Sequence, residues 1–230
     1  MEGQEKLRSS QALIIGAGGL GCPAALYLAA AGIGHLTIAD SDKVDLTNLQ
    51  RQILYRTDSV GAPKTEAARR ALRAINPEVN VVALQKRMQG ADLAKAVRDA
   101  DVVLDCSDNF ATRHAVNRAC VAHARPLVSG AAIRFDAQVM VFDRREKSAP
   151  CYACLFPEDA EVEEVQCATM GVFAPLTGIV GAMQAMEAIK LLTGAGEPLA
   201  GRLVIIDAKS AEWRSVKVAK DPRCAVCANA

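Results

Sequence analysis

Two pairs of cysteines have the spacing of metal ligands: Cys151 with Cys154, and Cys224 with Cys227. Each Cys-x-x-Cys pair places two thiolates where one ion can bind both, and four sulfurs complete a closed tetrahedral zinc site. Such a site leaves no open position for water, so its role would be structural. Unmetallated thiols or redox pairs are the alternatives, but a redox Cys-x-x-Cys normally acts alone near a helix start. The two pairs therefore predict a structural Zn²⁺.

A glycine-rich segment near the start of the chain has the spacing of a phosphate-binding loop. Gly16, Gly18 and Gly21 fit G-x-G-x-x-G, which allows a tight turn, close approach of backbone to phosphate, and a helix N-terminus aimed at the anion. An apolar run precedes the glycines, and Asp40 ends the next apolar run, where an acid can bind ribose hydroxyls. The alternative is a glycine turn that serves only packing. The context predicts a bound nucleotide.

Polar and basic side chains further along the chain indicate which nucleotide this is. Asn48, Arg51, Gln52 and Lys64 suit a triphosphate, because a guanidinium fork and a compact ammonium can neutralise different oxygens. Asp108 follows a predicted parallel strand, where it could hold Mg²⁺. Solvated surface charge is the alternative for the two cations, and a helix N-cap is the alternative for Asp108. A nicotinamide enzyme is disfavoured because no hydride pocket with its acid or base is evident.

The other four cysteines divide into two groups. Cys22, Cys106 and Cys120 lie in or beside predicted buried elements and are expected to be small apolar core residues. Cys167 instead ends an acidic segment, residues 157–166, that predicts a mobile loop. A thiol on a movable segment is a candidate nucleophile, although nothing in the sequence fixes its pKa.

Bulk properties exclude several classes of protein. The 27 basic and 26 acidic side chains nearly balance, which argues against an electrostatic nucleic-acid binder. Residues 168–186 lie in the longest uncharged run of the chain, but the polar residues and glycines among them predict a buried helix rather than a membrane span. The polar start of the chain shows no signal peptide, and the eight cysteines then indicate a reducing cytoplasm.

Short apolar runs and longer Ala/Leu-rich segments alternate through the first half of the chain. Strands are expected at residues 12–15, 35–39, 79–84, 102–104 and 126–129, and helices at 20–31, 63–75, 91–98 and 110–124. This alternation predicts an α/β, Rossmann-like, doubly wound sheet. The sheet should become mixed in a C-terminal, zinc-clipped antiparallel part, with strands at 137–142 and within 201–218 and a long buried helix at 172–192. We expect one domain, 1–230, with a nucleotide-binding half (1–130) and a carrier-binding and zinc half (131–230).

Nearly the whole chain resembles the ubiquitin-activating-like family of bacterial ThiF, MoeB and HesA adenylyltransferases. The resemblance rests on motifs in a fixed order: Gly16-Ala-Gly18-Gly19-Leu-Gly21, Asp40-Ser-Asp42, Asn48-Leu-Gln-Arg51-Gln52, Pro63-Lys64, Asp105-Cys-Ser-Asp108-Asn109, both cysteine pairs, and Met183-Gln-Ala-Met-Glu-Ala-Ile-Lys190. Such enzymes use ATP and Mg²⁺ to adenylate the C-terminal glycine of a small ubiquitin-like sulfur-carrier protein, and they release pyrophosphate. The resemblance also implies a homodimer.

The resemblance assigns roles to single residues. Asp40 would hold the ribose, Asn48, Arg51 and Lys64 would contact the phosphates, and Asp108 would bind Mg²⁺. Gly19, Asp42, Gln52 and Asn109 complete the expected nucleotide site. Cys167 matches a loop cysteine that takes part after adenylation in ThiF-like proteins. The catalytic set is then Arg51, Lys64, Asp108 and Cys167.

Several alternatives stay open at this point. Family members begin with Arg-Tyr-x-Arg-Gln before Gly-Gln-x-Lys-Leu, whereas here Met1 and Glu2 precede Gly3; either the chain is truncated, or another arginine substitutes, or activity is reduced. We expect no rhodanese-type domain after Ala230. Residues around Trp213 favour the thiamin-thiazole carrier (ThiS-like) over the molybdopterin carrier (MoaD-like). A protein that binds ATP and a ubiquitin-like partner without turnover is the rival hypothesis.

Overall fold

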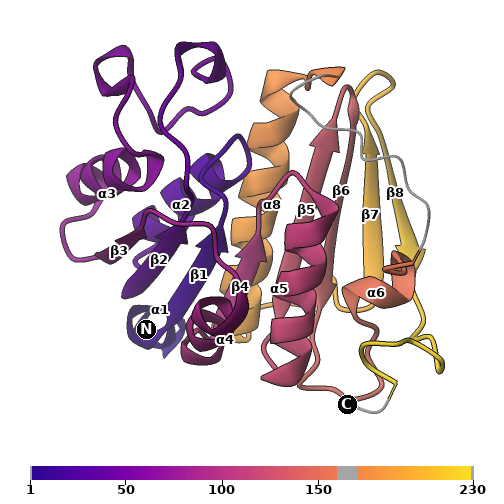
Figure 1. The fold of residues 1–230 in the computed structure, drawn as a ribbon. Coiled ribbons are helices and arrows are strands. Elements are labelled where there is room, and N and C mark those ends of the chain that lie inside the picture. The colour runs from indigo at the N-terminus through magenta and orange to yellow at the C-terminus, as the bar shows by residue number, and fades with distance from the viewer. Residues whose placement is uncertain (1, 160–169, 229–230) are drawn as a thin grey trace.

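One eight-stranded mixed sheet runs through the protein (Figure 1). The computed structural model describes residues 2–159 and 170–228. The strand order is β3-β2-β1-β4-β5-β6-β7-β8, in which the first five strands are parallel and the last three pair antiparallel. The strands span Gln11–Ile15 (β1), His35–Ala39 (β2), Asn80–Leu84 (β3), Val102–Asp105 (β4), Leu127–Ile133 (β5), Asp136–Phe142 (β6), Arg202–Asp207 (β7) and Glu212–Lys217 (β8).

Helices cover both faces of this sheet. On one face pack α1 (Glu2–Ser9), α2 (Gly21–Ala30), α3 (Lys64–Ile75) and α8 (Ala174–Thr193), and on the other pack α4 (Gly90–Asp99), α5 (Phe110–Ala122) and α6 (Tyr152–Leu155). Alternate residues of each central strand enter the two cores: Ile14 of β1 joins the α2/α8 core, whereas Leu13 joins the α4/α5 core. Because both faces are covered, these strands are apolar throughout rather than alternating.

The predicted architecture is confirmed, and the differences are local. The doubly wound arrangement, the parallel strands and the antiparallel C-terminal part all form as expected. Strand β5 continues to Ile133, beyond the predicted end at 129, because it pairs with β6 over seven positions from Leu127 to Ile133. The long helix starts at Ala174 rather than at residue 172, since Val172 forms a bridge with Arg134. Within residues 2–159 and 170–228, no helix combines the length and apolarity needed to cross a bilayer.

Candidate nucleotide site and cysteine cluster

A cleft opens at the carboxyl ends of the parallel strands, where β1 and β4 lie side by side. The helices that follow these two strands, α2 and α5, pack on opposite faces of the sheet, which makes this the topological switch point of the fold. The cavity measures about 460 Å³. Its lining includes residues predicted for the nucleotide site, namely Gly16, Gly18, Gly19, Asp40, Asp42, Asn48, Arg51, Gln52, Lys64, Asp108 and Asn109.

The glycine loop needs its glycines for steric reasons. Gly16 has φ of 95°, a left-handed value that favours glycine. A Cβ on Gly21 would lie 2.0 Å from the Gly16 carbonyl oxygen, so no larger residue fits there without moving the loop. A Cβ on Gly19 would meet Thr177 of α8 at 3.2 Å. The loop therefore turns tightly and brings Leu20, the N-cap of α2, to the cleft, whereas Gly21 serves the packing of the turn.

Two side chains hold this loop through the residue between its first glycines. The Ala17 amide donates to Asp40 Oδ2 at 2.7 Å, and the Asp42 amide donates to Asp40 Oδ1 at 2.8 Å. The Tyr55 hydroxyl donates to the Ala17 carbonyl at 2.7 Å, and burial raises the pKa of this phenol. Sequence reasoning missed Tyr55, because a single tyrosine in a polar segment carries no motif. Asp40 thus lies where it was predicted, and it also anchors the loop.

The predicted phosphate ligands come together on the segment between β2 and α3. Gln52 is buried, its Nε2 donates to Asn48 Oδ1 at 2.9 Å, and both side chains lie beside the half-buried Arg51. The Gln52 amide and the Arg51 amide both donate to the Asn48 carbonyl, so these three residues form one compact turn. Lys64 opens α3 and points its ammonium to Asp42 at 2.8 Å. Two cations thus face the glycine loop, which makes the cleft suitable for a polyanion.

Asp108 and Asn109 lie on the other side of the glycine loop, after β4. Asn109 is the N-cap of α5 and accepts from the Thr112 amide at 2.9 Å. The helix-cap alternative for Asp108 is therefore wrong, because the neighbouring residue fills that position. The Asp108 carboxylate is exposed at the cleft, and its Oδ1 accepts from Asn109 Nδ2 at 3.3 Å. An exposed carboxylate at a phosphate-binding loop is the kind of oxygen ligand that Mg²⁺ prefers.

Buried groups fix the turn that carries Asp108. The Asp105 carboxylate, fully buried, accepts from the Ser107 amide at 3.0 Å and from its hydroxyl at 2.6 Å. Burial raises the pKa of Asp105, and the nearby Arg113 guanidinium opposes that rise. Arg113 also donates to the Ser107 carbonyl at 2.8 Å. Gln184 of α8 donates to the carbonyls of Asp105 at 2.8 Å and Val128 at 3.2 Å, which ties the C-terminal end of β4 to the beginning of β5.

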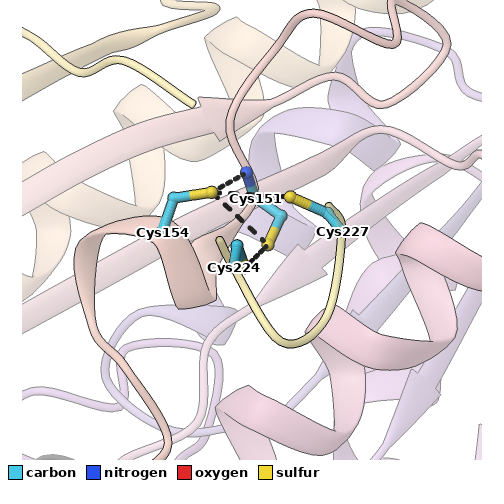
Figure 2. Close-up of side chains that lie close together, drawn as sticks. All are labelled: Cys151, Cys154, Cys224 and Cys227. Atoms are coloured by element: carbon cyan, nitrogen blue, oxygen red, sulfur yellow. Dashed lines mark hydrogen bonds between the residues drawn. The ribbon is translucent and has the colours of Figure 1, made fainter. Parts of the chain in front are cut away.

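The four cysteines predicted to bind zinc converge on one another (Figure 2), and Val121 of α5 packs against them. Their sulfurs all lie within 4.8 Å of one another, with Cys151 and Cys224 at 3.7 Å and Cys154 and Cys227 at 3.5 Å. Cys151 and Cys154 flank the start of α6, and the other pair lies in a turn of the C-terminal segment. Burial raises the pKa of Cys151 to about 11, and a bound cation would reverse this shift. Four converging thiols are the donor set of a tetrahedral Zn²⁺ site.

The remaining cysteines have different surroundings. Cys22, Cys106 and Cys120 are buried, and burial raises the pKa of each thiol, which agrees with the prediction that they are inert core residues. Cys106 also donates to Gln184 Oε1 at 3.4 Å. Cys167 and most of the acidic segment lie outside the described residues, so the prediction for this thiol stays a prediction.

Known proteins match this chain over almost all of its length. The model of the ThiF family matches residues 1–226. The sulfur carrier protein ThiS adenylyltransferase of Escherichia coli K12 is 49% identical over 227 residues, covering 99% of this chain and 89% of that protein. The molybdopterin-synthase adenylyltransferase of the same organism is 47% identical over 229 residues, covering 98% and 90%.

Solved structures agree with the sequence comparisons. The crystal structure of E. coli MccB with ATP superposes with a TM-score of 0.86 at 27% identity, covering 99% of this chain and 70% of that one. The crystal structure of E. coli MccB alone also superposes with a TM-score of 0.86. The chain therefore belongs to the ThiF family of adenylyltransferases.

Proposed function

We propose that this protein adenylates the C-terminal glycine of a small ubiquitin-like sulfur-carrier protein, with ATP and Mg²⁺ as co-reactants. The observation that carries the proposal is the single cleft in which a glycine loop, two cations and an exposed carboxylate meet. The names of its relatives support a sulfur carrier as the substrate. The solved structure of E. coli MccB with ATP supports the choice of nucleotide.

The cleft suggests a place for each part of ATP. The N–H groups of the glycine loop and the N-terminus of α2 would receive the phosphates. Asp40, at the end of β2, would accept hydrogen bonds from the ribose hydroxyls. The cleft is also lined by Asn48, Arg51, Gln52 and Lys64, so the charges of Arg51 and Lys64 would neutralise different phosphate oxygens. Asp108, with Asn109 beside it, would hold Mg²⁺, which would neutralise charge on the phosphates when bound.

The reaction needs positioning and charge neutralisation more than acid–base chemistry. A carboxylate oxygen of the carrier would attack the α-phosphorus of ATP, the bond from that phosphorus to the bridging oxygen would break, and pyrophosphate would leave. Two anions must approach each other in this step, so Arg51 and Lys64 would lower the barrier by their charge. The product is a mixed anhydride, in which the glycine carbonyl is activated toward sulfur.

A ThiS-like carrier is the substrate we propose, with a MoaD-like carrier as the alternative. Identities of 49% and 47% to the two kinds of enzyme do not separate them. The preference rests on the sequence around Trp213, whose side chain is 53% exposed on the edge strand β8. We further propose a homodimer acting in the cytoplasm, as the family resemblance and the reduced cysteines suggest, with one domain divided into its nucleotide (1–130) and carrier-and-zinc (131–230) halves.

Cys167 is proposed to act after adenylation, in sulfur transfer. The substitution Cys167→Ala should leave carrier-dependent pyrophosphate exchange near normal while it impairs sulfur incorporation into the carrier, measured by mass spectrometry of the carrier. Cys120→Ala, a buried thiol, provides a control for general effects of losing a cysteine. A collapse of the exchange reaction itself in Cys167→Ala would instead make this thiol a structural or positional residue.

The experiment that tests the proposed function is exchange of labelled pyrophosphate into ATP, with ThiS-like and MoaD-like carriers supplied separately. Exchange with one carrier is the expected result, and it would select the pathway as well as the activity. Tight ATP binding without exchange in either case would favour the rival function, a protein that holds ATP and a ubiquitin-like partner without turnover.

A further inference from the structure

The ammonium of Lys64 is held by a carboxylate at the mouth of the cleft. Its Nζ donates to Asp42 Oδ2 at 2.8 Å. The two side chains differ sharply in their surroundings: that of Lys64 is 6% exposed and that of Asp42 is 65% exposed. A buried ammonium without a partner would be unfavourable, so this ion pair holds the Lys64 side chain in place at the cleft before any ligand arrives.

The backbone fixes the same two residues relative to each other. The Lys64 amide donates to the Asp42 carbonyl at 3.0 Å, and Lys43 forms an antiparallel bridge with Pro63. The next pair of residues along these two segments is also hydrogen-bonded: the Val44 amide donates to the Ala62 carbonyl at 2.8 Å. Asp42 therefore cannot move away from the start of α3 unless this short ladder opens.

A continuous set of hydrogen bonds connects Lys64 to the glycine loop. Ala17 donates to one oxygen of Asp40 at 2.7 Å, and the Asp42 amide donates to the other at 2.8 Å. Asp42 then accepts the ammonium of Lys64. Asp42 is thus the link that sets the position of the cation relative to the loop that would cradle the phosphates.

We propose that Asp42 is a positioning residue that acts through Lys64, and that it makes no direct contact with the nucleotide or its metal. The proposal rests on the function proposed above and refines the role of one residue in that site. Its physical reason is charge: a solvent-facing carboxylate next to a triphosphate would repel it, whereas the same carboxylate can hold the ammonium until phosphate oxygens replace it.

A double-mutant cycle tests this assignment, because two residues that act as one unit lose their effect together. The four proteins are the unmodified chain, Asp42→Ala, Lys64→Ala and the double variant. The measurement is the Kd of a non-hydrolysable ATP analogue by calorimetry, with and without Mg²⁺. We expect Asp42→Ala to weaken binding about tenfold, the scale of one hydrogen bond to a charged group. The double variant should bind no more weakly than Lys64→Ala alone.

Two matched variants sharpen the result. Asp42→Asn removes the charge but keeps an acceptor for the ammonium, so its loss of binding should be about threefold, smaller than that of Asp42→Ala. Asp58→Ala removes an exposed carboxylate from the 3₁₀ turn Thr57–Ser59 of the same connection and should leave the Kd unchanged.

Three outcomes would overturn the assignment. Additive losses in the double variant would mean that Asp42 contacts the ligand directly. If Asp42→Ala weakens binding of the ATP analogue only when Mg²⁺ is present, Asp42 is a metal ligand. If Asp42→Asn weakens binding as much as Asp42→Ala does, Asp42 does not act as an acceptor for the ammonium. These results are separate from the exchange assay, because they measure binding alone; a wild-type chain that binds no ATP would overturn this inference and the proposed function together.

Discussion

At the scale of single residues, neighbours in the sequence have different tasks in this cleft. Asn109 caps α5 through the Thr112 amide, whereas the adjacent Asp108 leaves its carboxylate exposed at the cleft. Asn109 therefore stabilises the N-terminus of α5, whereas the exposed carboxylate of Asp108 is available for a cation.

Substitution of these two residues should give opposite phenotypes. Asp108→Ala should abolish pyrophosphate exchange with little change in the unfolding midpoint, because the side chain is exposed. Asn109→Ala should reduce stability by about 1 kcal/mol, the usual effect of removing an N-cap. Denaturant unfolding and the exchange assay measure the two effects. Unchanged exchange in Asp108→Ala would refute its assignment to Mg²⁺.

Tyr55 should support the glycine loop without touching the nucleotide. Tyr55→Phe removes the hydrogen bond to the buried Ala17 carbonyl, so stability should fall by about 1 kcal/mol and the KM for ATP should rise more than kcat falls. Tyr27→Phe, at a tyrosine that is 58% exposed on α2, is the matched control and should change neither quantity. An unaltered KM in Tyr55→Phe would show that the loop is held well enough by Asp40.

At the scale of elements, Gly21 at the start of α2 and Gly178 within α8 differ in the space around them. At Gly21 an added Cβ would meet the Gly16 carbonyl at 2.0 Å, so the loop and the helix must be this close. Gly178, inside α8, has no atom within 4 Å of the place where its Cβ would be among the described residues. One glycine is required by packing and the other is only a weak helix former.

This difference gives a paired test of the loop. Gly21→Ala should displace the loop and remove detectable ATP binding, with a loss of stability. Gly178→Ala should raise the free energy of unfolding by about 0.5–1 kcal/mol, because alanine restricts the unfolded chain and favours the helix. Thermal unfolding and ATP titration of both variants measure the outcome. ATP binding that survives in Gly21→Ala would mean that the loop tolerates a wider turn.

At the scale of the whole molecule, the cysteine cluster joins segments that lie far apart along the chain. It brings α6, which follows β6, against the C-terminal turn after β8. Asn117 of α5 holds the α6 side of the cluster, since its Oδ1 accepts from the Tyr152 amide at 2.9 Å and its Nδ2 donates to Cys151 Sγ at 3.6 Å. The cluster thus joins α6 to the C-terminal segment, and both lie next to α5 and the antiparallel half of the sheet (Figure 1).

Removal of zinc should unfold mainly this C-terminal part. A structural site contributes its binding energy to folding, so a chelator should lower the Tm, expose the four thiols to a thiol reagent and reduce protection of β7 and β8 in hydrogen exchange. The protection of β1 and β2 should fall less, and re-addition of Zn²⁺ should restore the Tm. An unchanged Tm after complete metal removal, verified by elemental analysis, would refute a structural role.

The sequence by itself determined the features that depend on local pattern. The glycine spacing, the alternation of apolar runs with helical segments and the two Cys-x-x-Cys pairs specify short-range geometry, and they predicted the loop, the doubly wound mixed sheet and the thiol cluster. The ends of β5 and α8 were less predictable, because the pairing of Arg134 with Val172 decides where the helix begins.

Only the tertiary structure decided which side chains support the site. Tyr55 bonds to a carbonyl 38 positions away, and Gln184 bonds to one 79 positions away, so neither contact leaves a local signal. Asp42 and Lys64, 22 positions apart, could each be placed in the site from their motifs, but their ion pair could not. Local patterns record which backbone conformations are favourable, whereas a buried hydrogen bond depends on which distant groups the fold brings within 3 Å of each other.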